Sequence, residues 1–327
     1  MVTVGQICCT IASTFPKFVC TLLLVWSYYA VIFKIDLVLV ENTFSAVAIL
    51  VLMTLLEALC LISYYFVVAI GPGSPSDFDE LRILPSDTDE TPVPPAFLQE
   101  NSITVKRDGG FRFCNKCKVW KPDRCHHCAS CDMCVLKMDH HCPWFADCIG
   151  FKNHKLFIQF LIYCTIYIAL ATAISGYSLY EIYYLETVDL DKFSLHIMFV
   201  FIVGLIMGLC VLIFTAFSIY QLLINRTTIE AYESQRYRSN QNAPYVGNIF
   251  NLGYKQNWRA VMGNSLVEWL LPIRLSSSYG SGLSFEINNL VYQKLRQETE
   301  LQQRLSQEIS NYRSYQKQIN QSALSYA

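Results

Sequence analysis

Long runs of apolar residues dominate the pattern of hydrophobic and polar positions along this chain. Four runs hold about 20 residues or more, the length that an α-helix needs to cross the hydrocarbon core of a bilayer. Only Lys17 in the first run and Glu57 in the second place a charge inside them. The pattern therefore predicts an all-α, polytopic membrane protein with four transmembrane helices. The runs lie at residues 11–33, 43–70, 156–180 and 193–224.

The polar segments between and after these runs divide the chain further. The linker after the second run opens with Gly71-Pro72-Gly73-Ser74-Pro75, which predicts a helix stop and then irregular chain. No fold-defining repeat is evident. The expected divisions are 1–70 (cytosolic N-terminus and first two helices), 71–113 (cytosolic linker), 114–155 (cysteine-rich domain), 156–224 (last two helices), 225–273 (cytosolic tail) and 274–327 (amphipathic or flexible C-terminal tail).

The distribution of charge predicts an orientation. Lys and Arg crowd the connection between the second and third runs, whereas the next connection carries mainly acids. Cytosolic connections of membrane proteins carry the excess of Lys and Arg. We therefore expect both termini and the 71–155 connection to face the cytosol, and the short loops 34–42 and 181–192 to face the lumen. Glu57 is expected to be a protonated or hydrogen-bonded packing residue, with a proton or ion pathway as the alternative.

Composition agrees with a membrane protein and excludes other classes. Of the 327 residues, 53% are hydrophobic and 16% are charged, whereas ordinary soluble domains have about 25% charged residues. The net charge of −1 does not favour a nucleic-acid partner, because such proteins present a basic surface. Disulfide scaffolds are short secreted chains, so the 14 cysteines indicate metal binding or catalysis. We expect no secretory signal peptide, because its charge and cleavage pattern is missing.

Eight of the 14 cysteines fall between Cys114 and Cys148, together with two adjacent histidine pairs. Structural zinc takes four Cys or His ligands, and a Cys-x2-Cys pair can reach one ion from a single turn. The segment therefore has enough ligands for two closed zinc sites, and we expect short hairpins that the two ions hold together. The candidate ligands are Cys114, Cys117, Cys128, Cys131, Cys134, Cys148, His127 and His141.

This count leaves Cys142 and His140 without a metal. A thiol close to an imidazole is what nucleophilic catalysis needs, because a free thiol is mostly protonated at neutral pH and a base must take its proton. His140 is the nearest candidate base, and Asp139 can fix its tautomer and stabilise the imidazolium. The alternative, in which Cys142 is a spare ligand and His140 a packing residue, stays open at this point.

One long and strict spacing runs through this segment. It reads Cys114-x2-Cys117-x9-His127-Cys128-x2-Cys131-x2-Cys134-x4-Asp139-His140-His141-Cys142-x5-Cys148. It resembles the cysteine-rich domain of the Asp-His-His-Cys (DHHC) protein S-acyltransferases. The resemblance extends to Thr227-Thr228-Ile229-Glu230, which matches the family's Thr-Thr-x-Glu motif, and to the C-terminal segment 250–263.

The resemblance implies a protein S-palmitoyltransferase. Such an enzyme moves a long-chain acyl group from acyl-CoA, with palmitoyl-CoA as co-substrate, to a cysteine of a membrane-associated protein. Cys142 is then the nucleophile that carries the acyl group, assisted by His140 and Asp139, while Cys125 and His126 are non-ligands. The implied zinc ligands are Cys114, Cys117, His127 and Cys134 for one ion, and Cys128, Cys131, His141 and Cys148 for the other.

Further roles follow from the same resemblance. Trp144 is expected to lie at the mouth of an acyl cavity and Tyr167 to contact the acyl chain, with plain helix packing as the alternative for Tyr167. The supporting residues are Thr227 and Thr228, of which Thr228 orients Asp139, then Glu230, which anchors the tail against the metal domain, and Asn257, which holds the tail segment onto the helix bundle.

Three stretches, 71–75, 119–127 and 142–146, resemble the vacuolar branch of this family in fungi. This implies a vacuole membrane protein, with Golgi or ER as the alternative, and as protein substrate the armadillo-repeat protein of vacuole fusion and inheritance. Most of the wider family has Asn-Asn where this chain has Ala146-Asp147, which are neither ligand nor catalytic positions. Two other classes stay open: a membrane-anchored zinc interaction module, in which Cys142 is dispensable, and a transporter that uses Glu57.

Overall fold

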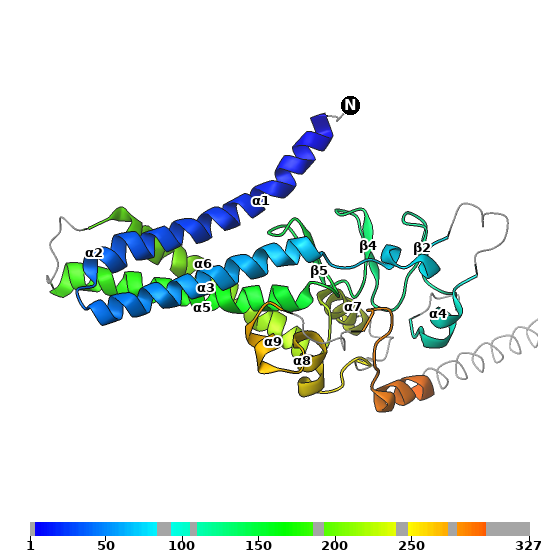
Figure 1. Cartoon of the computed structure of the whole chain (residues 1–327). Coiled ribbons are helices and arrows are strands. Elements are labelled where there is room, and N and C mark those ends of the chain that lie inside the picture. Colours follow the sequence, from blue (N-terminus) through cyan, green and yellow to red (C-terminus); the bar gives the residue numbers. More distant parts are fainter. Residues whose placement is uncertain are drawn as a thin grey trace, which may run out of the picture.

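The computed structural model describes residues 4–83, 93–104, 110–185, 193–239, 248–273 and 280–298 (Figure 1). Within these residues, four helices are long and apolar enough to cross a membrane, and they form one elongated bundle (Figure 1). This confirms the predicted architecture of four membrane-spanning helices. Their spans are Thr14–Leu39, Thr43–Ile70, His154–Tyr184 and Leu195–Leu223.

The first span is longer than the sequence predicts. From Thr14 on it combines the later part of α1 (Val4–Tyr29), a π-helical segment (Ala30–Asp36) and α2 (Leu37–Leu39). Most of the loop expected at 34–42 is therefore helical. The reason is that Lys34 and Asp36 look like the polar end of a helix, yet the side chain of Asp36 is buried within the structure.

Helix α5 (His154–Tyr180) lies at the centre of the bundle, where both α3 (Thr43–Ile70) and α6 (Leu195–Leu223) pack against it. In the most apolar stretch of each span, 50% of the residues of the α5 span are buried within the protein, compared with 11% for α6. Helix α6 therefore presents apolar side chains outward, as a membrane span does. A π-helical turn (Glu181–Leu185) follows α5, and the rest of the predicted luminal loop lies outside the described residues.

Glu57 of α3 is buried, and neither of its carboxylate oxygens has a hydrogen-bond partner among the residues described above. A carboxylate that moves ions or protons within a membrane usually has an ionisable partner. The transporter alternative therefore gains no support from the structure.

Three short antiparallel hairpins form the cysteine-rich domain at one end of the bundle (Figure 1). The last residue of each first strand is a cysteine, and Cys114, Cys128 and Cys142 follow one another at intervals of 14 residues. Each hairpin turns through a residue with a left-handed φ between 46° and 54°, four residues after its cysteine. The domain is thus a threefold repeat that the sequence analysis did not detect. The strands are β1 (Phe113–Cys114), β2 (Val119–Trp120), β3 (His126–Cys128), β4 (Met133–Val135), β5 (His140–Cys142) and β6 (Asp147–Ile149).

The segment expected to be an irregular linker is partly structured. It contains two 3-10 turns, Pro75–Asp77 and Asp79–Leu81, and helix α4 (Ala96–Asn101). Leu81 and Leu98 are buried in one cluster with Trp120 and Leu136 of the hairpins. These scattered leucines contribute a small hydrophobic core, which explains why the segment is ordered.

The C-terminal helices pack at the same end of the bundle as the hairpins (Figure 1). They are α7 (Thr228–Ser239), α8 (Tyr254–Met262) and α9 (Leu266–Leu270). An extended segment follows from residue 280, and a last helix covers 289–298. This helix lies within the tail expected to be amphipathic or flexible (274–327), and residues 299–327 lie outside the described residues.

Candidate active site

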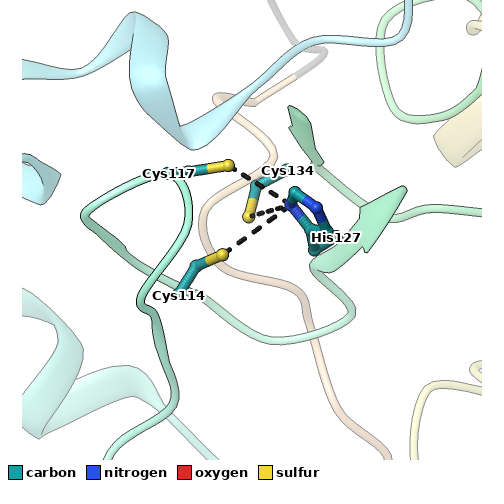
Figure 2. A group of neighbouring side chains, drawn as sticks. All are labelled: Cys114, Cys117, His127 and Cys134. Atoms are coloured by element: carbon teal, nitrogen blue, oxygen red, sulfur yellow. Dashed lines mark hydrogen bonds between the residues drawn. The ribbon is translucent and has the colours of Figure 1, made fainter. Parts of the chain in front are cut away.

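Two groups of Cys and His side chains in the hairpins could each hold a metal ion. In the first, the Nδ1 atom of His127 lies 3.3 Å from the sulfur of Cys117, 3.7 Å from that of Cys114 and 3.9 Å from that of Cys134 (Figure 2). Four atoms bound to zinc at ~2.3 Å in a tetrahedron are about 3.8 Å apart. The four side chains therefore have the right chemistry and separation for a closed zinc site.

The second group repeats this arrangement one hairpin further along the chain. The Nδ1 atom of His141 lies 3.3 Å from the sulfur of Cys131 and 3.7 Å from those of Cys128 and Cys148. Both groups contain the ligand sets that the family resemblance implies. Cys125 belongs to neither group, although it is fully buried beside Cys134.

The hairpin repeat explains why Cys142 stays outside the metal groups. In the first two hairpins, a second cysteine follows three residues after the first, whereas the third hairpin has Phe145 at that position. The next hairpin supplies the His and the Cys that complete each pair. Helix α5 follows the third hairpin in place of a fourth one. The first cysteine of the last hairpin, Cys142, therefore has no partners to complete a site, and its thiol belongs to neither metal group.

His140 and Asp139 lie beside this free thiol. The Nδ1 atom of His140 is 2.6 Å from Oδ2 of Asp139. The imidazole packs edge-on against the rings of Phe157 and Phe214. Its Nε2 atom is buried without a hydrogen-bond partner in the described part of the chain, and His140 and Cys142 line one cavity. An imidazole held in this way can exchange a proton through Nε2.

The electrostatic surroundings favour an ion pair between the two side chains. Burial lowers the pKa of His140, but the hydrogen bond with Asp139 and the interaction with Cys142 together raise it to about 9. Burial raises the pKa of Asp139, yet the hydrogen bond with His140 and the neighbouring histidines hold it well below its usual range. At neutral pH, Asp139 is therefore a carboxylate that stabilises the imidazolium.

The start of α7 holds Asp139 in place. Thr228 donates from its backbone N–H to Oδ1 and from its hydroxyl to Oδ2, both over 2.9 Å. This is the contact that the resemblance led us to expect. Thr227 caps the same helix, because its hydroxyl accepts a hydrogen bond from the N–H of Glu230. An acid bonded by a helix N-terminus is favoured in its charged form.

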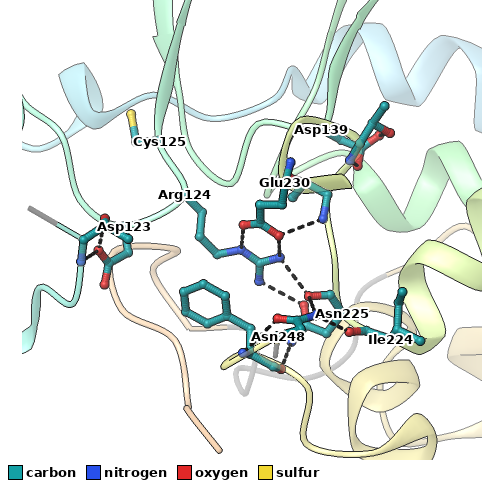
Figure 3. A network of polar contacts seen from close by, with 12 residues as sticks. Asp123, Arg124, Cys125, Asp139, Ile224, Asn225, Glu230 and Asn248 are labelled. Atoms are coloured by element: carbon teal, nitrogen blue, oxygen red, sulfur yellow. Dashed lines mark hydrogen bonds and ion pairs between the residues drawn. The ribbon is translucent and has the colours of Figure 1, made fainter. Parts of the chain in front are cut away.

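Arg124 joins the hairpins to α7 through Glu230, the residue expected to anchor the tail against the metal domain. Its guanidinium donates two hydrogen bonds to the carboxylate of Glu230, over 2.7 and 2.9 Å (Figure 3). It also donates to the side-chain and backbone oxygens of Asn225, over 2.9 and 3.0 Å. The side chain of Arg124 is almost fully buried. A bidentate pair with extra hydrogen bonds is the geometry that makes a buried charge tolerable.

An apolar cavity of about 440 Å³ extends from Cys142 into the bundle. Side chains of α1, α5 and α6 line it, and Trp144, 47% exposed, lies at the hairpin end beside Pro143. The hydroxyl of Tyr64 on α3 donates to the backbone oxygen of Trp144 over 2.6 Å, which fixes this loop against the bundle.

Tyr167 lines the same cavity from α5 and is buried. Its hydroxyl is 3.0 Å from that of Ser27 on α1, so the two side chains form a polar bridge across the apolar lining. Sequence reasoning missed Ser27. The available signal was a hydroxyl within an otherwise apolar run.

Asn257 joins the segment before α8 to the C-terminal end of α6. Its side-chain amide donates to the backbone oxygen of Leu223 and to the side chain of Asn251, both over 2.7 Å. Asn153 does the same for the hairpins, because it donates to the backbone oxygens of Val67 and Cys148. Both asparagines are almost fully buried.

Comparison with known proteins places this geometry in a family. The profile described as DHHC palmitoyltransferase matches residues 108–235. The chain is 39% identical over 310 residues to Palmitoyltransferase PFA3 of Candida glabrata, covering 89% of this chain and 92% of the relative. It is 41% identical over 275 residues to Palmitoyltransferase PFA3 of Saccharomyces cerevisiae, covering 81% and 80% of the two chains. The chain belongs to the DHHC palmitoyltransferase family.

The relationship reaches beyond fungi. Palmitoyltransferase ZDHHC15 of Xenopus laevis is 31% identical over 294 residues, covering 86% of this chain and 84% of the relative. The DHHC motif itself is Asp139 followed by strand β5, and its aspartate bonds to Thr228 at the start of α7. In this chain the Thr-Thr-x-Glu motif therefore lies next to the cysteine-rich domain, although 85 residues of chain separate Cys142 from Thr228.

Proposed function

We propose that the protein is a protein-cysteine S-palmitoyltransferase, in which Cys142 carries the acyl group between acyl-CoA and the protein substrate. One observation supports this most directly. Among the described residues of the hairpin repeat, Cys142 is the only cysteine that lines the apolar cavity. It also lies beside the His140–Asp139 pair. The membership in the DHHC family agrees with this reading.

The reaction has two thioester exchanges. In the first, His140 holds the proton of Cys142 as an imidazolium that Asp139 stabilises, the thiolate attacks the acyl carbonyl of acyl-CoA, and the thiolate of CoA leaves with that proton. In the second, the thiol of the protein substrate gives its proton to His140 and attacks the Cys142 thioester, and Cys142 leaves and is reprotonated. Both steps exchange one thioester for another, so the protein supplies positioning and proton transfer.

The two metal groups have a structural role in this proposal. Cys114, Cys117, His127 and Cys134 would hold one zinc ion, and Cys128, Cys131, His141 and Cys148 the other. The hairpins have too few apolar residues for a core of their own, so bound zinc would supply their folding energy. Because His141 lies between His140 and Cys142, the second ion would also fix the strand that carries both.

The cavity accounts for the location at a bilayer. Each methylene transferred from water to an apolar site contributes about 0.8 kcal/mol, so a long acyl chain binds where apolar side chains surround it. Trp144 would guide the chain in at the hairpin end, and Tyr167 would contact it inside the cavity. The protein substrate would reach Cys142 from the same membrane surface.

The proposal extends to the location and the protein substrate, for which the relatives and the charge pattern give support. We propose a vacuole membrane protein with both termini and the hairpins in the cytosol, and an armadillo-repeat protein of vacuole fusion and inheritance as substrate. The support is the identity of 36–41% with the fungal relatives and the excess of Lys and Arg in the hairpin connection.

Mass spectrometry of the purified protein with palmitoyl-CoA tests the proposal. We expect one hydroxylamine-sensitive palmitoyl group on Cys142 and none in the Cys142→Ser variant. Cys210→Ser is the matched control, because this exposed thiol also lines the cavity and its loss should leave the acyl group in place. A wild type without any acyl group would instead support the zinc interaction module, and full transfer to a protein substrate by Cys142→Ser would show that another residue is the nucleophile.

A further inference from the structure

The chain beyond α9 returns to the hairpins. Residues 281–292, which we name the C-terminal strap, lie between the hairpins and the segment before α8. Leu283 is buried with Leu81 and Trp120. At the other end of the strap, Asn288 donates from its backbone N–H to the oxygen of Ile249 over 2.7 Å. Its side chain donates to the oxygen of Asn251 over 3.0 Å. The strap therefore fastens the hairpins to the tail segment.

Gly282 shows that the strap lies very close to the hairpin domain. Its φ is +78°, and a Cβ atom at this position would lie 2.6 Å from the ring of Phe151. A left-handed backbone with no room for a side chain requires glycine. The strap is therefore seated in one particular register, which sets the position of Phe285 three residues later.

Phe285 inserts beside two buried cations. Its ring centroid lies 5.2 Å from the guanidinium carbon of Arg124 and 5.9 Å from the ammonium of Lys137. The ring also packs edge-on against Phe250, with centroids 6.1 Å apart, and Phe250 in turn lies 4.4 Å from the same guanidinium. The negative face of an aromatic ring stabilises such cations, and more so where water is excluded.

Arg124 connects this ring to the reactive group through a short series of bonds. It pairs with Glu230, and the carboxylate of Glu230 also accepts from the backbone N–H of Thr227 over 2.9 Å. The next residue, Thr228, holds both oxygens of Asp139. A change in the position of Arg124 therefore shifts the helix start that orients Asp139 and, through it, His140.

We propose that the C-terminal strap is a positioning element, in which Phe285 holds Arg124 and thereby keeps the start of α7 aligned on Asp139. Its effect on acyl transfer rests on the proposed function, whereas its effect on α7 does not. The strap lies outside the part of the chain that the family profile matches, which ends at residue 235.

The test compares substitutions that keep the apolar contact with those that keep the aromatic ring. Phe285→Leu fills much of the same space but has no ring to face the cations, and Phe285→Tyr retains the ring. Leu290→Ala is the matched control, because Leu290 is on the next turn of chain and 81% exposed. The rate of Cys142 acylation is measured in a single turnover at saturating palmitoyl-CoA, and zinc content is measured on the same samples.

We expect Phe285→Leu to slow acylation about fivefold, the size of one or two such cation–π contacts, with full zinc content. Phe285→Tyr and Leu290→Ala should stay within about twofold of the wild type. In a Thr228→Val background, Phe285→Leu should add little further loss, because its effect passes through Thr228. Equal rates for the Leu variant and the wild type, equal losses for Leu and Tyr, or fully additive losses would each overturn the proposal.

A second variant and a second readout keep the test independent of folding and of the proposed function. Asn288→Ala removes the side-chain hydrogen bond that helps to hold the far end of the strap and leaves Phe285 intact, and Asn289→Ala is its exposed neighbour and control. Hydrogen exchange at residues 225–231 should speed up in Phe285→Leu and Asn288→Ala but not in Asn289→Ala. Unchanged exchange would refute the strap's role. If the variants show this exchange pattern but the wild-type protein is not acylated at Cys142, the proposed function is refuted and the role of the strap is not.

Discussion

Replacing Tyr167 by alanine should shift the preference of the enzyme toward longer acyl chains. Tyr167 is almost fully buried in α5, lines the cavity, and bridges to Ser27 of α1 through its hydroxyl. Removal of the ring leaves apolar space into which a longer chain can extend.

The expected size of this shift follows from the number of additional methylenes that the acyl chain buries. Each additional methylene contributes about 0.8 kcal/mol when it enters an apolar cavity, which is about a fourfold gain in kcat/KM. Stearoyl-CoA has two more methylenes than palmitoyl-CoA, so the ratio of their rates should rise by up to about 15-fold. The deleted ring also costs about 3–5 kcal/mol of folding stability. This loss does not affect the comparison, because both acyl-CoA rates are measured on the same sample of the variant and a smaller amount of folded protein lowers them equally.

Competition between the two acyl-CoA substrates, read by intact mass of the Cys142 thioester, measures this ratio directly. Tyr167→Phe keeps the ring and loses only the hydroxyl, so its ratio should stay near that of the wild type. Tyr177→Ala is the matched control, since Tyr177 lies on the same helix, is 60% exposed and does not line the cavity. A Tyr167→Ala variant with the wild-type ratio would refute the reasoning and return this residue to plain packing.

Other expectations concern the hairpin domain. His140→Ala should slow acylation of Cys142 by about 10²–10⁴-fold with zinc retained; loss of zinc would make it a ligand. Cys128→Ala should halve the zinc content and lower the melting temperature, and an unchanged stoichiometry would contradict the ligand assignment. Asn153→Ala removes hydrogen bonds to two buried carbonyls and should cost about 1–3 kcal/mol in thermal unfolding; a loss below measurement would exclude it as an anchor. Because the pKa of His140 is raised to about 9 from its ordinary value of about 6.5, its ion pair with Asp139 stabilises the fold fully below pH ~6.5 and that contribution is lost as the pH rises through about 9. The melting temperature of the wild type should therefore fall more than that of His140→Ala between about pH 7 and pH 10, and parallel curves would show that the pair adds no stability.

The long apolar runs by themselves determined the four membrane-spanning helices, because a backbone in hydrocarbon must satisfy its own hydrogen bonds and a helix is the only way for a single segment to do so. Ligand chemistry and spacing likewise predicted two zinc sites and their eight candidate ligands, since zinc accepts few ligand types. The family resemblance divided these ligands into the two groups that the structure brings together. The predicted end of the first span, at residue 33, was wrong, because the sequence cannot show that Asp36 is buried.

Only the tertiary structure showed why one cysteine of the three hairpins is free. The hairpins repeat every 14 residues in the pairing of their strands and in the conformation of their turns. The amino-acid sequence of the third hairpin departs from this repeat, because Phe145 stands where the first two hairpins have a cysteine ligand. Ser27, Arg124 and Phe285 were equally hidden. Their partners lie 140, 106 and more than 100 residues away along the chain, and contacts of that separation follow from how helices and hairpins pack, which local pattern does not encode.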